Sequence, residues 1–129
     1  MLQKEQPFFD TNALMPTLED LTHRIIAFRD AREWKQFHNP KDMALSLVLE
    51  AGEVMEHFQW KNQEEMKRHL QERGTEIGEE LADVLYWVLL MGNDFGIDVL
   101  QALEKKIEKN EAKYPIEKAK GSHTKYTQL

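Results

Sequence analysis

The 129-residue sequence predicts an all-α protein, an antiparallel helical bundle of four main helices and one short helix. Apolar residues recur at the three- and four-residue spacing of a helix in several segments. Most of these segments follow a residue that commonly caps a helix N-terminus. No stretch alternates convincingly like a strand, and the short connections between segments favour antiparallel neighbours.

Composition limits the partners that we expect. The net charge of −6 argues against a nucleic-acid polymer as ligand, because such binding depends on clustered Lys and Arg. The chain has no cysteine, which excludes disulfides and a thiolate nucleophile. It shows neither a signal-peptide pattern nor an apolar run of membrane length, so we expect a cytoplasmic protein with no membrane partner.

The chain is expected to form one domain with an extension at each end. Residues 1–16 contain Pro7 and Pro16 without a helical period, and we expect them to form an N-terminal arm. Residues 17–115 form the predicted helical domain, and residues 116–129 are predicted to be an extended, polar C-terminal tail.

The first helix is predicted to begin after Thr17, whose hydroxyl can cap the helix with Asp20 in the first turn. Its amphipathic pattern continues to about Arg32. The segment 34–38 then reads Trp-Lys-Gln-Phe-His, an aromatic and polar connector.

The second helix is predicted to begin at Asn39-Pro40, since Asn is a preferred cap and Pro is tolerated at the first helical position. Its apolar pattern continues to about Trp60. Asn62 looks like another cap, opening a short charged helix that runs through about Glu72.

Gly74-Thr75 is expected to end the short helix and cap the third main helix, which runs to about Asp94. Gly96 supplies a residue that can adopt the left-handed conformation after a helix end. Asp98 is predicted to cap the last helix, which ends before Tyr114-Pro115. The residues of this helix that we expect to face inward are Val99, Ala102, Leu103 and Ile107.

The candidate site consists of four acids on the two most apolar helices. Glu50 and Glu53 are three residues apart on one helix, and Glu80 and Asp83 repeat the spacing on the other. Side chains three apart share a helix face, so packing the two helices together would gather four carboxylates in one pocket.

Gathered carboxylates repel one another, and an unpaired buried carboxylate costs several kcal/mol. Residues 42–60 and 74–100 contain no Lys or Arg, so the two helices do not supply their own counter-ions. Hard oxygen ligands favour Mg²⁺, with Mn²⁺ as the alternative. Helical spacing also allows Glu76 or Glu79 to contribute, and spacing alone does not choose among the acids.

Other carboxylate chemistries fit less well. Di-iron bundles carry Glu-x-x-His on two helices, and no histidine of this sequence follows a glutamate by three residues. Paired carboxylates of glycosidases normally belong to larger folds with a sugar cleft. Phosphate-ester chemistry with Mg²⁺ held by carboxylates is the simplest interpretation.

The two acid-bearing helices are also apolar around much of their circumference. One small monomer cannot bury that much apolar surface, so we expect a homo-oligomer.

The chain resembles the MazG-type all-α nucleoside triphosphate pyrophosphohydrolases, and most closely their small dCTP pyrophosphatase-like branch. The family motif appears as Glu50-Ala-Gly-Glu53 and Glu80-Leu-Ala-Asp83. The resemblance covers roughly residues 17–127. It extends through Thr17-Leu-Glu-Asp-Leu, Trp34-Lys-Gln-Phe-His38, Phe58-Gln-Trp60, Asn110-x-x-x-Tyr114-Pro115 and Lys125-Tyr-Thr.

The resemblance implies Mg²⁺-dependent hydrolysis of a nucleoside triphosphate, first of all dCTP or a related pyrimidine, to the monophosphate and pyrophosphate. Such an enzyme would serve as house-cleaning of the nucleotide pool. It implies that all four motif acids hold the metal and that Glu50 or Glu53 takes part in activating water. It further implies a tetramer with sites near the subunit interfaces. The residues implied to bind substrate are Trp34, Lys35, Gln36, Phe37, His38, Trp60, Trp87, Lys106 and Asn110.

Two departures from the branch leave the base preference open. Ile25 stands where the branch has a histidine on the first helix, and Trp87 stands where it has a tyrosine. The alternative hypothesis is a non-catalytic oligomeric module that binds nucleotides or partner helices. A missing motif acid would favour that alternative, and none is missing.

Overall fold

The computed structural model describes residues 15–129, and these residues form helices and loops with no strand among them. The predicted all-α class is therefore confirmed, while most of the predicted arm lies outside the described residues. The elements are α1 (Leu18–Ala31), η1 (Trp34–Phe37), α2 (Pro40–Glu56), α3 (Gln63–Glu72), α4 (Gly74–Phe95), α5 (Val99–Lys113), α6 (Ile116–Ala119) and η2 (Tyr126–Gln128), where η marks a 3₁₀ helix.

Four helices begin at the predicted caps. In each case the cap side chain accepts a hydrogen bond from the backbone N–H three residues later, which satisfies one of the free donors of the first turn. Gly96 has φ of +67° and ends α4 in the left-handed conformation, as predicted. The four capping residues are Thr17, Asn39, Asn62 and Asp98.

Two predicted helix boundaries are wrong. α2 ends at Glu56 instead of near Trp60, because the chain turns sharply there and Trp60 has φ of +67°. α4 begins at Gly74, so Thr75 lies inside its first turn and does not cap it. Arg73 stands at both the end of α3 and the start of α4, which leaves no loop between the two helices.

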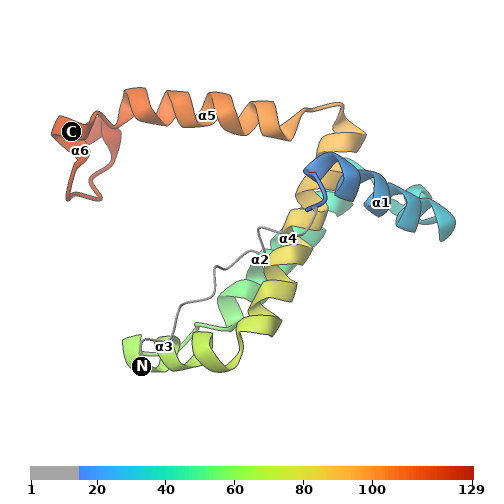
Figure 1. The fold of residues 1–129 in the computed structure, drawn as a ribbon, viewed down its shortest axis with the longest axis horizontal. Helices are drawn as coiled ribbons and strands as arrows, with labels where there is room; N and C mark the ends of the chain where they lie inside the picture. Colours follow the sequence, from blue (N-terminus) through green and yellow to red (C-terminus); the bar gives the residue numbers. More distant parts are fainter. Residues whose placement is uncertain (1–14) are drawn as a thin grey trace.

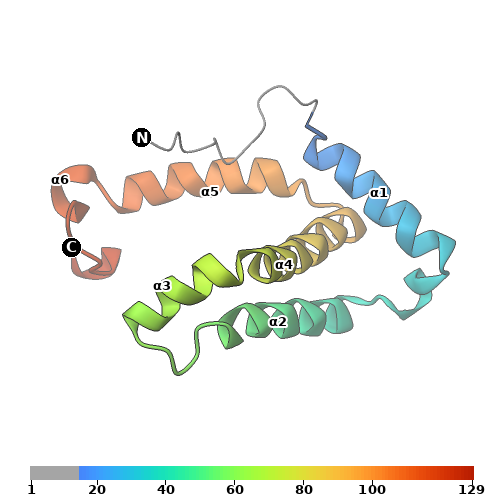
Figure 2. The same cartoon turned by 60° about the horizontal axis from the view of Figure 1, so that its bottom comes forward.

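α4 is the central helix of the fold. It packs most extensively against the antiparallel α2 and also contacts α1, α3 and α5 (Figures 1 and 2). The buried apolar residues of the described chain all belong to α2 and α4. They are Met43, Ile77, Leu89 and Leu90.

α5 leaves the end of α4 and runs away from the α2 and α4 pair (Figure 1). At the turn, a Cβ on Gly92 would meet Val99 Cγ1 at 2.7 Å, so the two helices approach closely at this point. The prediction that the apolar face of α5 points inward is wrong for the single chain. Leu103 and Ile107 are 57% and 48% exposed because no other described helix covers them.

The C-terminal tail is not simply extended, as we had expected. It contains α6 and η2, and it folds back on the end of α5. Lys113 Nζ lies 4.7 Å from the ring centroid of Tyr126, and Tyr114 packs edge-on against the same ring. These aromatic contacts hold the tail near α5.

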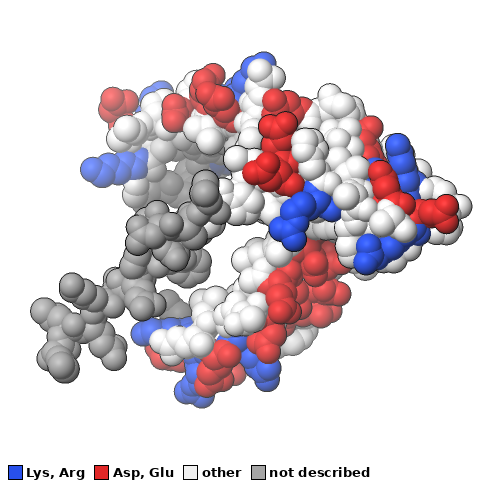
Figure 3. Space-filling model, turned by 45° about the vertical axis from the view of Figure 1, so that its right-hand side comes forward, with Lys and Arg blue, Asp and Glu red and all other residues white. Residues whose placement is uncertain are grey.

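Much apolar surface of α2 and α4 stays exposed in the single chain. Charged side chains on the face drawn in Figure 3 are separated by broad uncharged areas. No helix within residues 15–129 combines the length and the apolar character that crossing a membrane requires. The large exposed side chains of the two helices include Leu45, Val48, Leu49, Met55, Leu81 and Leu85.

Candidate active site

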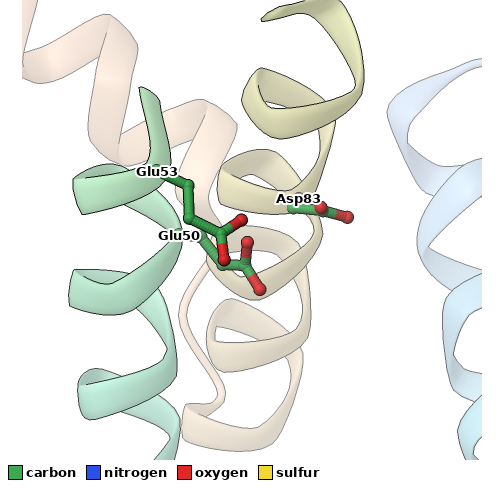
Figure 4. Close-up of side chains that lie close together, drawn as sticks. All are labelled: Glu50, Glu53 and Asp83. Carbon is green, nitrogen blue, oxygen red and sulfur yellow. The ribbon is translucent and has the colours of Figure 1, made fainter. Parts of the chain in front are cut away.

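Three of the four predicted acids meet between α2 and α4. Glu50 and Glu53 reach from α2 toward α4, and the Asp83 carboxylate points to the side of α4 that faces α1 (Figure 4). One oxygen of each carboxylate lies within 4.8 Å of the others, a spacing that allows shared coordination of a cation. We call Glu50, Glu53 and Asp83 the acid cluster.

Glu50 is the least exposed member of the acid cluster. Its Oε2 atom is buried without a hydrogen-bond partner among residues 15–129. Burial raises the pKa of Glu50, and the negative charges of Glu53 and Asp83 raise it further. A buried carboxylate oxygen with no donor and two acidic neighbours is the environment that a divalent cation would satisfy, and the hard oxygen donors fit Mg²⁺ or Mn²⁺.

The fourth motif acid, Glu80, lies at the edge of the acid cluster. Its charge contributes to raising the pKa of Glu50, so the two carboxylates are near each other. Its Oε2 contacts Nε2 of His57, the residue that follows α2. His57 Nδ1 in turn lies 2.7 Å from His69 Nε2 on α3.

Neither histidine was among the predicted site residues. A signal for His57 existed, because it follows Glu50 by seven residues, two turns of helix, and so falls on the same face. For His69 the sequence offers no comparable signal, since its approach to His57 depends on how the loop after α2 places α3.

The structure distinguishes Glu76 and Glu79, the two other acids that helical spacing allowed, from the acid cluster. Glu76 Oε1 accepts a hydrogen bond of 3.0 Å from Arg73 Nη1, so this glutamate has a counter-ion. The residue just before α4 thus provides the positive charge that the helix itself lacks. Glu79 is exposed and is not part of the acid cluster.

A cavity of about 410 Å³ lies between α1 and α4 and includes Asp83 in its wall. Its lining is mainly apolar, and burial raises the pKa of the Tyr86 hydroxyl in that wall. Ile25, the residue at a departure from the family branch, lines the same cavity. Trp34 packs edge-on against the lining residue Phe28 with a centroid distance of 5.6 Å.

The other residues of the predicted segment 34–38 lie in different surroundings. Lys35 and His38 line a separate cavity of about 340 Å³ near the end of α4. His38 packs edge-on against Trp87 with a centroid distance of 5.2 Å, and its Nδ1 is buried without a partner among the described residues. Gln36 donates to the Glu33 carbonyl, and Phe37 is exposed.

Three further predicted substrate residues are exposed and are not part of the acid cluster. Trp60 is 92% exposed in the loop between α2 and α3. Lys106 and Asn110 are exposed on α5, the helix that runs away from α2 and α4.

Comparisons with known proteins agree on one family. A family model described as the MazG-like family matches residues 45–129, the part that carries all four motif acids. Proteins described as dCTP pyrophosphatase 1 from Mus musculus and Homo sapiens are each 38% identical over 117 residues, which is 88% of this chain and 68% of theirs. The crystal structure of a pyrophosphatase from Archaeoglobus fulgidus superposes with a TM-score of 0.74 at 36% identity, covering 82% of this chain and 99% of that one.

Proposed function

Because the chain belongs to the MazG-like family, we propose that it hydrolyses deoxynucleoside triphosphates to the monophosphate and pyrophosphate. It is a nucleoside triphosphate pyrophosphohydrolase, with dCTP or a modified pyrimidine deoxynucleotide as first candidate substrate. Its proposed role is house-cleaning of the nucleotide pool in the cytoplasm.

The observation that carries this proposal is the acid cluster with its buried, unpartnered Glu50 oxygen. Glu50, Glu53 and Asp83 would hold Mg²⁺, with Glu80 as the fourth ligand and Mn²⁺ as an alternative ion. Bound there, the metal would supply positive charge that neutralises the carboxylates and the phosphate oxygens of the substrate. Without a cation, the same cluster would repel a triphosphate.

The carboxylates also supply the base that the reaction needs. Glu50 or Glu53 accepts a proton from the attacking water, whose oxygen forms the new bond to phosphorus as the α,β-anhydride bond breaks. Pyrophosphate then leaves as one product and the nucleoside monophosphate as the other. Burial of Glu50 keeps part of this site away from bulk water.

The cavity beside Asp83 is the proposed place of the nucleoside. Phe28 and Tyr86 offer aromatic surface there, and stacking on an aromatic side chain contributes about 1–3 kcal/mol per base. Ile25 gives the wall an apolar residue that cannot hydrogen-bond to a base edge. Trp34 packs edge-on against Phe28 and so helps to hold this wall of the cavity in place.

We propose that the active form is a homo-oligomer, a tetramer with its sites near the subunit interfaces. The exposed apolar side chains of α2, α4 and α5 support this proposal, because exposed patches of that kind normally meet a partner. Lys106 and Asn110 would then reach the phosphates and sugar from a neighbouring copy. Trp60 would line the substrate site of the assembled oligomer. Lys35, Gln36, Phe37, His38 and Trp87 stay proposed substrate residues.

A panel of common and modified deoxynucleoside triphosphates, incubated with Mg²⁺ or Mn²⁺, tests the proposed function. Stoichiometric pyrophosphate and monophosphate from at least one substrate is the expected result. Only orthophosphate, or no product from any member of the panel, would favour the non-catalytic nucleotide-binding or partner-binding module.

A further inference from the structure

A line of three polar side chains leads from α3 to the edge of the acid cluster. His69 Nε2 lies 2.7 Å from His57 Nδ1, and His57 Nε2 contacts Glu80 Oε2. The side chains of His57 and Glu80 are only 14% and 26% exposed. We call His69, His57 and Glu80 the histidine relay.

The local geometry fixes both rings. His57 follows the last residue of α2, while His69 lies in the last turn of α3. Phe58 packs against both, with centroid distances of 6.3 Å to His57 and 6.1 Å to His69. The rings therefore have little room to turn away from each other.

His57 Nε2 and Glu80 Oε2 are both buried and lie in close contact, and neither atom has a hydrogen-bond partner elsewhere among the described residues. An ionised Glu80 carboxylate can only accept, so His57 must carry its hydrogen on Nε2. At the other contact, the donor and acceptor roles of His57 Nδ1 and His69 Nε2 depend on the tautomers of the two rings. Burial lowers the pKa of His69, with the charges of Lys61 and His57 acting in the same direction, which fits a neutral ring.

We infer that His57, held in orientation by His69, positions the Glu80 carboxylate for metal binding. His57 holds one carboxylate oxygen and leaves the other free to coordinate a cation at the acid cluster. Without that contact, a partly exposed glutamate would sample several rotamers, and fixing it on metal binding would cost entropy. Both histidines are positioning residues, because they act through Glu80. The inference rests on the proposed function in one respect, namely that Glu80 is a metal ligand.

Metal binding by the otherwise intact protein tests this inference without any measurement of turnover. The probe is Mn²⁺ alone, titrated into metal-free protein and followed by calorimetry or electron paramagnetic resonance. His57→Phe keeps a ring and removes both nitrogens, whereas His57→Gln keeps an N–H donor at a position like Nε2. Outer-shell partners of metal ligands typically contribute about 10–100-fold in affinity. We therefore expect His57→Phe to raise the Mn²⁺ Kd by about tenfold or more and His57→Gln to restore most of the affinity. The matched control is the exposed His23→Gln on α1, which should bind as the wild type does.

A second pair of variants covers the case in which His57→Phe does not fold. His69→Leu should weaken Mn²⁺ binding because His57 loses its orientation, and His69→Gln should recover it through its amide donor. The positioning role is wrong if His57→Phe and His69→Leu, or whichever of the two folds, bind Mn²⁺ like the wild type. It is also wrong if the wild type itself binds no Mn²⁺. If the wild type binds Mn²⁺ with the expected histidine dependence but hydrolyses no nucleotide, the proposed function fails while the positioning role stands.

Discussion

Arg29 Nη1 on α1 donates a hydrogen bond of 2.6 Å to Asp94 Oδ2 in the last turn of α4. The Arg29 side chain is 1% exposed and that of Asp94 is 15% exposed. Burial alone would raise the pKa of Asp94, but the hydrogen bonds from Arg29 and Asn93, with the charge of Arg29, outweigh burial and lower it. The pair thus fastens α1 to α4, the two helices that enclose the cavity beside Asp83.

Replacing Asp94 by Asn should destabilise the fold strongly. The change leaves the Arg29 guanidinium buried without its main counter-ion, a loss that costs about 3–5 kcal/mol in comparable buried pairs. Asp30→Asn is the matched control, because Asp30 contacts the same guanidinium at 3.3 Å but is 52% exposed. The control should cost less than about 1 kcal/mol. Urea unfolding of both variants checks this, and equal midpoints would contradict it.

The caps and the helix class were readable from the sequence because they depend on contacts within four residues. Thr17 and Asn62 cap their helices through side chains three positions from the N–H that they accept. The course of α5 was not readable. The turn at Gly96 sends α5 away from α4, and apolar spacing predicts that a face is buried without saying which molecule buries it.

The metal-free protein should lose stability as the pH rises from mildly acidic values. The folded-state pKa of Glu50 lies above its ordinary value of 4.5, because burial and neighbouring acids disfavour the charge. Between the two pKa values the folded state binds more protons than the unfolded state, so the free energy of unfolding falls as the pH rises through that window. Glu50→Gln should flatten this slope. Melting curves in EDTA across that pH range measure the slope. An unchanged slope in the variant would argue against a raised pKa of Glu50.

Divalent metal should reverse that loss. Binding to the folded state alone adds RT ln(1 + [L]/Kd), about 2.7 kcal/mol when the metal is at a hundredfold excess over Kd. Wild-type protein at neutral pH should therefore melt clearly higher in millimolar Mg²⁺ than in EDTA. Asp83→Asn removes one carboxylate of the acid cluster and should respond much less. Equal responses of the two proteins would mean that Asp83 is not a ligand.

The chain of 15.2 kDa should sediment as an oligomer at micromolar concentration. Val48 and Leu49 are 66% and 69% exposed side by side on α2, a surface that we expect another copy to cover. Leu49→Glu should shift the sedimentation coefficient toward that of a monomer, whereas Glu64→Gln at an exposed position on α3 should not. A monodisperse monomer for the wild type would refute the assembly.

The convergence of Glu50, Glu53 and Asp83 could be predicted because three-residue spacing places acids on one helix face. The place of Glu80 could not, since its contact with His57 depends on a histidine beyond the motif. The contacts of Lys106 and Asn110 could not be predicted either, because both side chains are exposed on α5 in the single chain.

Product analysis with and without one motif acid shows whether the acid cluster catalyses hydrolysis. We expect wild-type protein with Mg²⁺ to convert its preferred deoxynucleoside triphosphate to equimolar monophosphate and pyrophosphate. Glu53→Gln keeps the size of the side chain and removes a charge of the acid cluster, so it should lose activity by orders of magnitude while its melting temperature is maintained or rises. Full pyrophosphate release by a folded Glu53→Gln variant would contradict the claim that the acid cluster is the catalytic site.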